Sequence, residues 1–178
     1  MKVGILGGIG LLASISTASC TSVADLPTER LATARLNLAN GMPAGTVQVL
    51  GSGDSLTLAV AVTGLSQGPH GFHLHTSGAC TAPDFKSAGG HLNPLGKSHG
   101  TLDPAGPHLG DLPNLIAGSN GTASATIDLE ENNRDQVMDW LFDADGTAVV
   151  IHAGPDDYRT DPAGAAGSRV ACGVLKRT

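Results

Sequence analysis

The chain contains few aromatic residues and few positive charges. Of its 178 residues one is Trp, one is Tyr and three are Phe, so aromatic residues make up only 3% of the sequence. Ten Lys and Arg residues stand against 16 Asp and Glu, which gives a formal net charge of −6. A chain of this charge is repelled by a phosphate backbone, and this argues against a nucleic-acid partner. The length suits one domain with a hydrophobic core.

The sequence also lacks an apolar run long enough to span a bilayer. The longest run, residues 3–15, follows the single charge of Lys2 and is interleaved with small residues. Such a segment is typical of an export signal, with no transmembrane span in the mature protein. Cleavage after Ala24 makes residues 1–24 a signal peptide and residues 25–178 a single domain. Lipoprotein-type cleavage before Cys20 would instead leave a lipid anchor on that cysteine, and the sequence favours neither site.

Cysteine is scarce, with three residues. After Cys20 is removed or lipidated, Cys80 and Cys172 remain as one pair. In an oxidising compartment two such cysteines are expected to form a disulfide. A crosslink that closes a loop of roughly 90 residues stabilises the fold by about 4.5 kcal/mol on the chain-entropy model.

Glycine is abundant, with 25 residues, and it separates short runs that are apolar or alternate with period two. These runs are RLNLAN, TVQVLG, SLTLAVAVTGL, GFHLH, TASATIDL, TAVVIHA and RVACGVL. Alternation of this kind is typical of half-buried strands. The pattern predicts an all-β fold, an antiparallel Greek-key β-barrel or sandwich of about eight strands. Residues 25–34 are expected to precede the first strand, and residues 136–142 to form one helical turn.

Two long segments, residues 76–118 and 154–167, show no convincing strand pattern. Loops of this length inside a compact domain are usually functional. The first loop contains three histidines and a cysteine, and the second directly follows another histidine. We therefore expect the strands to be a scaffold and the two loops to carry the chemistry.

Four histidines lie in or at the end of strand-like runs. His73 and His75 are two residues apart, so alternation places their side chains on one face, where they can chelate one ion. His152 ends a second run and would complete a set of three imidazoles, which suits Cu(II) or zinc. His70 is an odd number of residues from His73 and His75, so alternation turns its side chain to the other face. It is expected to be a hydrogen-bonded core residue.

A second group lies in the first long loop and comprises His91, His99, His108 and Asp111. Three imidazoles and a carboxylate fill the four positions of a tetrahedral zinc site and leave none open for water. Such a closed site orders a loop, and this argues against a hydrolytic zinc enzyme. The chain also has no Met or Cys placed as in a blue-copper site, which disfavours simple electron transfer.

The motifs GFHLH, AGGHLNP, HLGDLPN, VVIHAG and GSRVACGV together resemble the copper,zinc superoxide dismutases, and most closely their bacterial exported branch. The resemblance covers roughly residues 34–178. It implies a Greek-key β-barrel with one copper and one zinc per subunit, while the sequence leaves monomer and homodimer both open. It further implies that superoxide anion is converted to oxygen and hydrogen peroxide by alternating Cu(II) and Cu(I), in the periplasm or cell envelope.

The resemblance also assigns roles to individual residues. The copper ligands would be His73, His75, His91 and His152, and the zinc ligands His91, His99, His108 and Asp111. His91 would bridge the two ions and take up a proton when it leaves reduced copper. Asp156 resembles the carboxylate that hydrogen-bonds one copper ligand and one zinc ligand, and Arg169 the arginine that meets the anionic substrate. His91 and Arg169 are therefore the expected catalytic residues.

Two other functions compete with this interpretation. A non-catalytic protein that stores or passes copper and zinc would usually hold copper through Met or Cys, and would not need Arg169 or Asp156. A structural zinc domain with an idle copper site would not need the three histidines of the strand-like runs. We therefore favour the enzyme.

Some features have no assigned role. Lys97, and less strongly Lys86 and Arg159, are candidates for steering the anion, although an ordinary solvated cation is the favoured interpretation of each. Residues 130–145 are longer and more acidic than the resemblance implies, and no function follows from their sequence.

Overall fold

The computed structural model describes Met1, residues 28–129 and residues 133–178. The expected signal segment therefore lies outside the described residues apart from Met1. Within the part of the chain that is described, no helix is long and apolar enough to cross a membrane.

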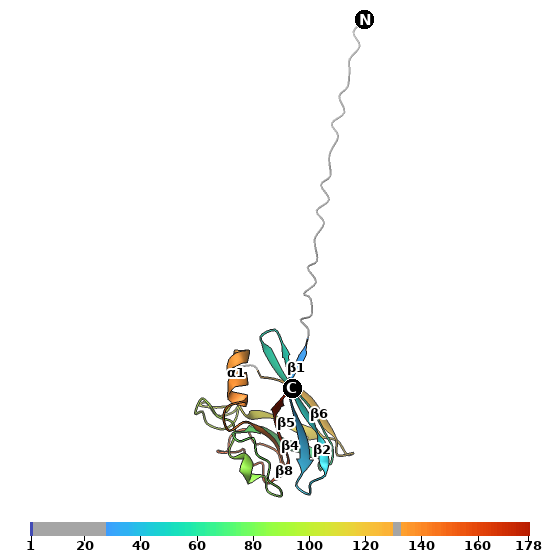
Figure 1. Cartoon of the computed structure of the whole chain (residues 1–178), viewed down its shortest axis with the longest axis vertical. Coiled ribbons are helices and arrows are strands. Elements are labelled where there is room, and N and C mark those ends of the chain that lie inside the picture. The colour runs from blue at the N-terminus through green and yellow to red at the C-terminus, as the bar shows by residue number, and fades with distance from the viewer. Residues whose placement is uncertain (2–27, 130–132) are drawn as a thin grey trace.

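The described residues form a nine-stranded antiparallel sheet that curls into a nearly closed barrel (Figure 1). The elements are β1 (Glu29–Leu38), β2 (Pro43–Ser52), β3 (Ser55–Val62), β4 (Gly68–His75), η1 (Lys86–Ala88), β5 (Asp111–Ala117), β6 (Ala123–Asp128), α1 (Arg134–Leu141), β7 (Ala148–His152), β8 (Arg169–Val174) and β9 (Lys176–Arg177). The predicted all-β fold is confirmed.

The strand order makes the barrel a Greek key. It runs β5-β4-β7-β8-β1-β2-β3-β6, and the short β9 pairs with β1. β3 pairs with β6, and β4 pairs with β7. The connections from β3 to β4 and from β6 to β7 therefore join strands that are not neighbours in the sheet, as in a Greek key. The long connections after β4 and β7 lie beside each other on one side of the strands (Figure 1).

Alternation along the strands places the core inside the barrel. In β3, for example, Leu56, Leu58, Val60 and Val62 are buried while the residues between them are more exposed. The core continues to α1, where Val137 and Leu141 are fully buried. The barrel is thus a rigid support for the loops at its side.

Three boundaries differ from the sequence predictions. β1 begins at Glu29, inside the segment expected to precede the first strand, because its first inward side chains, Ala32 and Ala34, are too small to give a strong pattern. β5 lies inside the segment expected to lack a strand. Pro113 interrupts its pattern, but a proline is tolerated there because β5 is at an edge of the sheet. The predicted single turn is an eight-residue helix, whose first turn is capped by the Asn133 side chain.

The Cys80–Cys172 disulfide is present, with the two Cα atoms 5.7 Å apart. Cys80 lies in the loop after β4 and Cys172 in β8. The bond therefore ties the first part of the histidine-rich loop to the barrel wall.

Candidate metal centre

Strands β4 and β7 carry three of the clustered histidines. His73 and His75 are fully buried in β4, and strand alternation places both rings on one side. His152 is the last residue of β7, which pairs with β4. His91 joins them from the loop, because it forms an isolated β-bridge with His75. One ligand atom from each of these four residues lies within 4.8 Å of the others.

A hydrogen bond from the second nitrogen fixes the ring of three of these histidines. His73 Nε2 is 2.6 Å from an oxygen of Asp156, His75 Nδ1 is 3.0 Å from the Gly89 carbonyl, and His152 Nδ1 is 3.1 Å from the Gly167 carbonyl. Each of these nitrogens must carry the proton, so the other nitrogen of each ring keeps its lone pair.

The remaining nitrogens test whether this set fits a metal. Among the described residues, Nδ1 of His73 and Nε2 of His75, His91 and His152 are buried and have no hydrogen-bond partner. A buried lone pair without a partner costs free energy. Four such nitrogens that converge on one point fit a copper ion, for which imidazole nitrogen is a suitable ligand.

The second set is built around the carboxylate of Asp111, at the start of β5. Its Oδ1 atom is 2.7 Å from Nδ1 of His91 and 3.1 Å from Nδ1 of both His99 and His108. The Oδ2 atom accepts hydrogen bonds from the backbone N–H groups of Gly100 and His108. One oxygen is thus held by the loop, and the other faces three nitrogens, which is the donor set of a closed zinc site.

His91 belongs to both sets. Its Nδ1 atom faces Asp111, and its Nε2 atom is one of the four buried nitrogens of the first set. The rings of His91 and His73 are 4.0 Å apart between centroids. A single imidazole therefore separates the two candidate metal positions.

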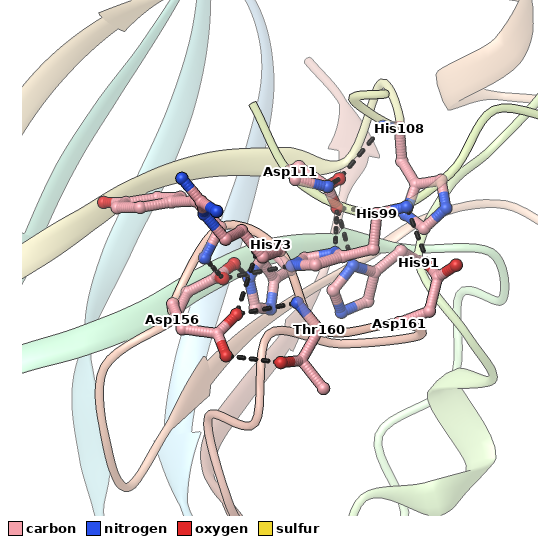
Figure 2. A network of polar contacts seen from close by, with 12 residues as sticks. His73, His91, His99, His108, Asp111, Asp156, Thr160 and Asp161 are labelled. Carbon is pink, nitrogen blue, oxygen red and sulfur yellow. Dashed lines mark hydrogen bonds and ion pairs between the residues drawn. The ribbon is translucent and has the colours of Figure 1, made fainter. Parts of the chain in front are cut away.

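Asp156 links the two sets a second time (Figure 2). Its Oδ2 atom accepts from His73 Nε2 at 2.6 Å, and its Oδ1 atom accepts from His99 Nε2 at 3.0 Å. The Tyr158 backbone N–H donates to the same Oδ1 atom. One carboxylate thus fixes the orientation of a ring in each set. A change at Asp156 should therefore alter the geometry of both sets.

Asn114 holds Asp156 in place, and the sequence analysis missed it. Its side chain donates to the Asp156 carbonyl and accepts from the Asp156 N–H, each at 2.9 Å. Its own N–H donates to the hydroxyl of Tyr158. Asn114 lies in the motif HLGDLPN, but its role could not be read from the sequence because Pro113 concealed the strand that positions it.

Arg169 lies beside the first set. It pairs with His152 between β7 and β8. Its guanidinium donates to the carbonyls of Phe85 and Gly89, at 2.7 and 2.6 Å. The Gly89 carbonyl also accepts from His75 Nδ1, so one carbonyl connects the arginine to a ring of the cluster.

The protonation states suit metal binding. Burial lowers the pKa of His91 and of His152 to about 4 and that of His75 to about 2, so these rings are neutral at pH 7. Burial alone would raise the pKa of Asp111, but hydrogen bonds from His91 and from two backbone N–H groups outweigh it and lower the pKa to about 2. Neutral imidazole and ionised carboxylate are the forms that bind metals.

His70 stays outside both sets, as its parity predicts. It is buried, and its ring nitrogens contact the carbonyls of His152 and Ser66 at 2.7 and 2.9 Å. It therefore supports the end of β7 and offers no free lone pair.

A β-barrel that holds two metal positions around one shared histidine defines a small class of metalloproteins. The family model of copper/zinc superoxide dismutase (SODC) matches residues 43–175. The superoxide dismutase [Cu-Zn] of Caulobacter vibrioides is 43% identical over 148 residues, which cover 82% of this chain and 85% of that protein. The chain belongs to the copper/zinc superoxide dismutase family.

Further relatives and solved structures agree with the family. Superoxide dismutase [Cu-Zn] 2 of Aquifex aeolicus is 48% identical over 110 residues, or 59% of this chain, and the match spans 62% of its length. A SOD-like protein from Bacillus subtilis superposes with a TM-score of 0.75 at 35% identity and covers 81% of this chain and 97% of its own. The Cu/Zn superoxide dismutase from Brucella abortus gives a TM-score of 0.65 at 29% identity, with 84% and 100% covered. The two sets of ligands fit a copper site and a zinc site.

Proposed function

We propose that this chain is a superoxide dismutase that converts superoxide to oxygen and hydrogen peroxide. The copper ligands are His73, His75, His91 and His152, and the zinc ligands are His91, His99, His108 and Asp111. The observation that carries the proposal is the position of His91, whose two ring nitrogens face different ligand sets.

The two sets would support different tasks. Copper, when bound, supplies a one-electron redox couple, which dismutation requires and zinc lacks. The zinc set orders the loop that carries three of its own ligands, because all four of its positions are occupied by the chain. The carboxylate of Asp156 keeps rings of both sets in one tautomer and orientation.

His91 and Arg169 are the residues that act on the substrate. With a zinc ion on Nδ1, His91 would hold and release a proton only at Nε2, the nitrogen that belongs to the copper set. That proton would be delivered toward peroxide. The guanidinium of Arg169, fixed by two carbonyls, attracts and orients the superoxide anion in a protein that is acidic overall. Positive focusing of this kind, already known for this family, raises anion association rates by about 10- to 1,000-fold.

We also propose that the protein acts in the periplasm or cell envelope. Residues 1–24 would be its export signal, or Cys20 its lipid anchor, with residues 25–178 as the mature domain. The Cys80–Cys172 disulfide supports an oxidising compartment. One relative is named an extracellular superoxide dismutase [Cu-Zn], from Onchocerca volvulus. The mature protein would be a monomer or homodimer.

The activity is tested by following superoxide decay after pulse radiolysis. Protein loaded with copper and zinc is compared with the same protein loaded with zinc only. We expect decay near the diffusional ceiling only when copper is present, as this family is known to approach it. A protein that binds both metals and leaves superoxide untouched would refute the proposal and favour a metal carrier.

A further inference from the structure

A groove of about 690 Å³ lies on the outer face of β1, where β8 and β9 pair with it. None of the metal ligands lines it. Four of the chain's ten Lys and Arg residues do, namely Arg30, Arg35, Lys176 and Arg177, and no Asp or Glu of the described residues lines the groove with them. Thr178 also lines the groove, where its hydroxyl donates to the Arg30 carbonyl. This concentration of positive charge is notable in a chain of net charge −6.

The strand register places Arg35 and Lys176 on the same face of the sheet. Lys176 is the direct partner of Thr33 between β9 and β1, so the two side chains share a face. Arg35, two residues after Thr33, points to that same face. Arg35 and Lys176 are therefore diagonal neighbours on one face, at a separation that two long side chains can bridge to reach one ligand.

No Asp or Glu side chain of the described residues forms an ion pair with these four residues. The Arg and Lys ion pairs lie elsewhere, between Arg134 and Glu29 and between Lys86 and Asp84. Arg177 has a different partner, since its guanidinium carbon lies 4.5 Å from the centre of the Phe142 ring. Because Arg177 is the partner of the buried Ala32, its side chain points to the other face from Lys176, so the cations that share the outer face are Arg30, Arg35 and Lys176. The groove is therefore a set of placed cations without a counter-charge among the side chains of the described residues.

The donors in the groove select the chemistry of its ligand. The guanidinium groups of Arg30 and Arg35 match the oxygens of phosphate, to which each can donate two parallel hydrogen bonds, and Lys176 adds a third positive charge. The Thr33 hydroxyl and the Asn37 amide add further donors to the lining. Since a water molecule occupies about 30 Å³ of liquid, the groove has room for more than one phosphate group.

We propose that this groove binds an anionic ligand that carries two or more phosphate groups. The site is separate from the metal centre and does not depend on the proposed dismutase activity. Binding would weaken as salt concentration rises, because Arg30, Arg35 and Lys176 are exposed to solvent.

The test is a calorimetric titration of the metal-loaded protein with inorganic tripolyphosphate at physiological salt. We expect one bound tripolyphosphate per chain, and at least a tenfold loss of affinity in the double variant Arg35→Ala, Lys176→Ala. Both side chains are exposed, so the variant should keep its zinc content and its disulfide, and these are measured alongside.

The matched control is the double variant Lys86→Ala, Arg159→Ala, which also removes two exposed positive charges but leaves the groove intact. Its affinity should stay within about twofold of the parent. Equal losses in the two double variants would show that only net charge matters and would overturn the proposal. Absence of binding by the parent protein would overturn it as well.

A second arm identifies the source of the phosphate groups. The parent and the groove variant are sedimented with vesicles of phosphatidylcholine containing a phosphorylated inositol lipid, and with vesicles of phosphatidylcholine alone. Selective sedimentation of the parent with the phosphorylated vesicles indicates a lipid headgroup. Binding of tripolyphosphate without sedimentation indicates a soluble phosphate compound.

Discussion

Gly164 lies so close to Asp156 that a Cβ atom built on the glycine would stand 1.8 Å from the carboxylate oxygen Oδ1. The same Cβ would be 2.8 Å from Nε2 of His99. Gly164 also has a φ of +65°, which side chains rarely adopt. The loop after β7 therefore reaches the carboxylate that joins the two metal sets only because this residue has no side chain.

Gly164→Ala should displace Asp156 and release His99 from its orientation. Because the partners of ligand histidines usually contribute 10- to 100-fold to metal affinity, we expect zinc affinity to fall by about that factor. Competition with a chromophoric chelator measures it. Gly96→Ala is the control, since Gly96 has a φ of +62° but nothing within 4 Å of its added Cβ. An equal loss in the control would mean that backbone strain, and not the contact with Asp156, is responsible.

Asp156→Asn should reduce both zinc and copper affinity, again by about 10- to 100-fold, because an amide cannot accept at both ends from His73 and His99. Asp157→Asn is the matched control, because Asp157 is exposed and its carboxylate, among the described residues, accepts from Thr160 and from nearby backbone N–H groups, away from both ligand sets. Wild-type affinity for both metals in Asp156→Asn would refute the linking role.

Asn114→Ala should weaken zinc binding less than Asp156→Asn, because it removes the clamp on the backbone and leaves the carboxylate itself. If Asn114 acts through Asp156, the double variant Asn114→Ala, Asp156→Asn should bind zinc no more weakly than Asp156→Asn. Additive losses in this double-mutant cycle would show that Asn114 acts by another route.

The stability of the metal-free, disulfide-bonded protein should fall as pH decreases from about 6.5 toward 4. Burial lowers the pKa of His91 and His152 to about 4, whereas an unfolded histidine titrates near 6.5. The unfolded state therefore binds more protons in this window, and the free energy of unfolding should drop by about 2 kcal/mol for each residue between pH 7.5 and pH 5.

Urea unfolding at the two pH values measures this loss. Asp111 does not contribute to this loss. Its pKa is lowered to about 2, so the stability that it adds is lost only as pH falls from about 4 toward 2. An unchanged free energy of unfolding between pH 7.5 and pH 5 would mean that these histidines titrate normally in the fold.

Arg169→Ala should lower the rate of superoxide decay at least tenfold and reduce its dependence on ionic strength, while copper and zinc contents stay constant. Arg169→Lys should restore part of the salt dependence, since it keeps the charge, but not the full rate, since it cannot reproduce two donors in one plane. Pulse radiolysis over a range of salt concentrations measures both quantities. Loss of copper from Arg169→Ala would instead assign the arginine a structural role.

The sequence predicts much of this site because its ligands are of rare types in tight motifs. GFHLH places two rings on one face by alternation, and the Cys80–Cys172 pair follows from the cysteine count. The supports were harder to predict because they use the backbone. The backbone carbonyls of Gly89 and Gly167 orient His75 and His152. Every residue has a backbone carbonyl, so the residue types do not indicate this role.

The missed parts of the fold have similar causes. β5 was not predicted because Pro113 interrupts its alternating pattern. The start of β1 was not predicted because its inward residues are alanines, which bury little apolar surface. Asn114 could not be recognised as a clamp without knowing that β5 passes the loop of Asp156. Contacts between segments far apart in the chain are set by the fold, and local patterns do not record them.

The bridging position of His91 is tested most directly by crystallography of the metal-loaded protein, with anomalous data collected at the copper and zinc absorption edges. We expect a copper peak about 2.0–2.1 Å from His91 Nε2 and a zinc peak at the same distance from His91 Nδ1, as is usual for imidazole ligands. A single metal, or two metals of which only one contacts His91, would contradict the shared site.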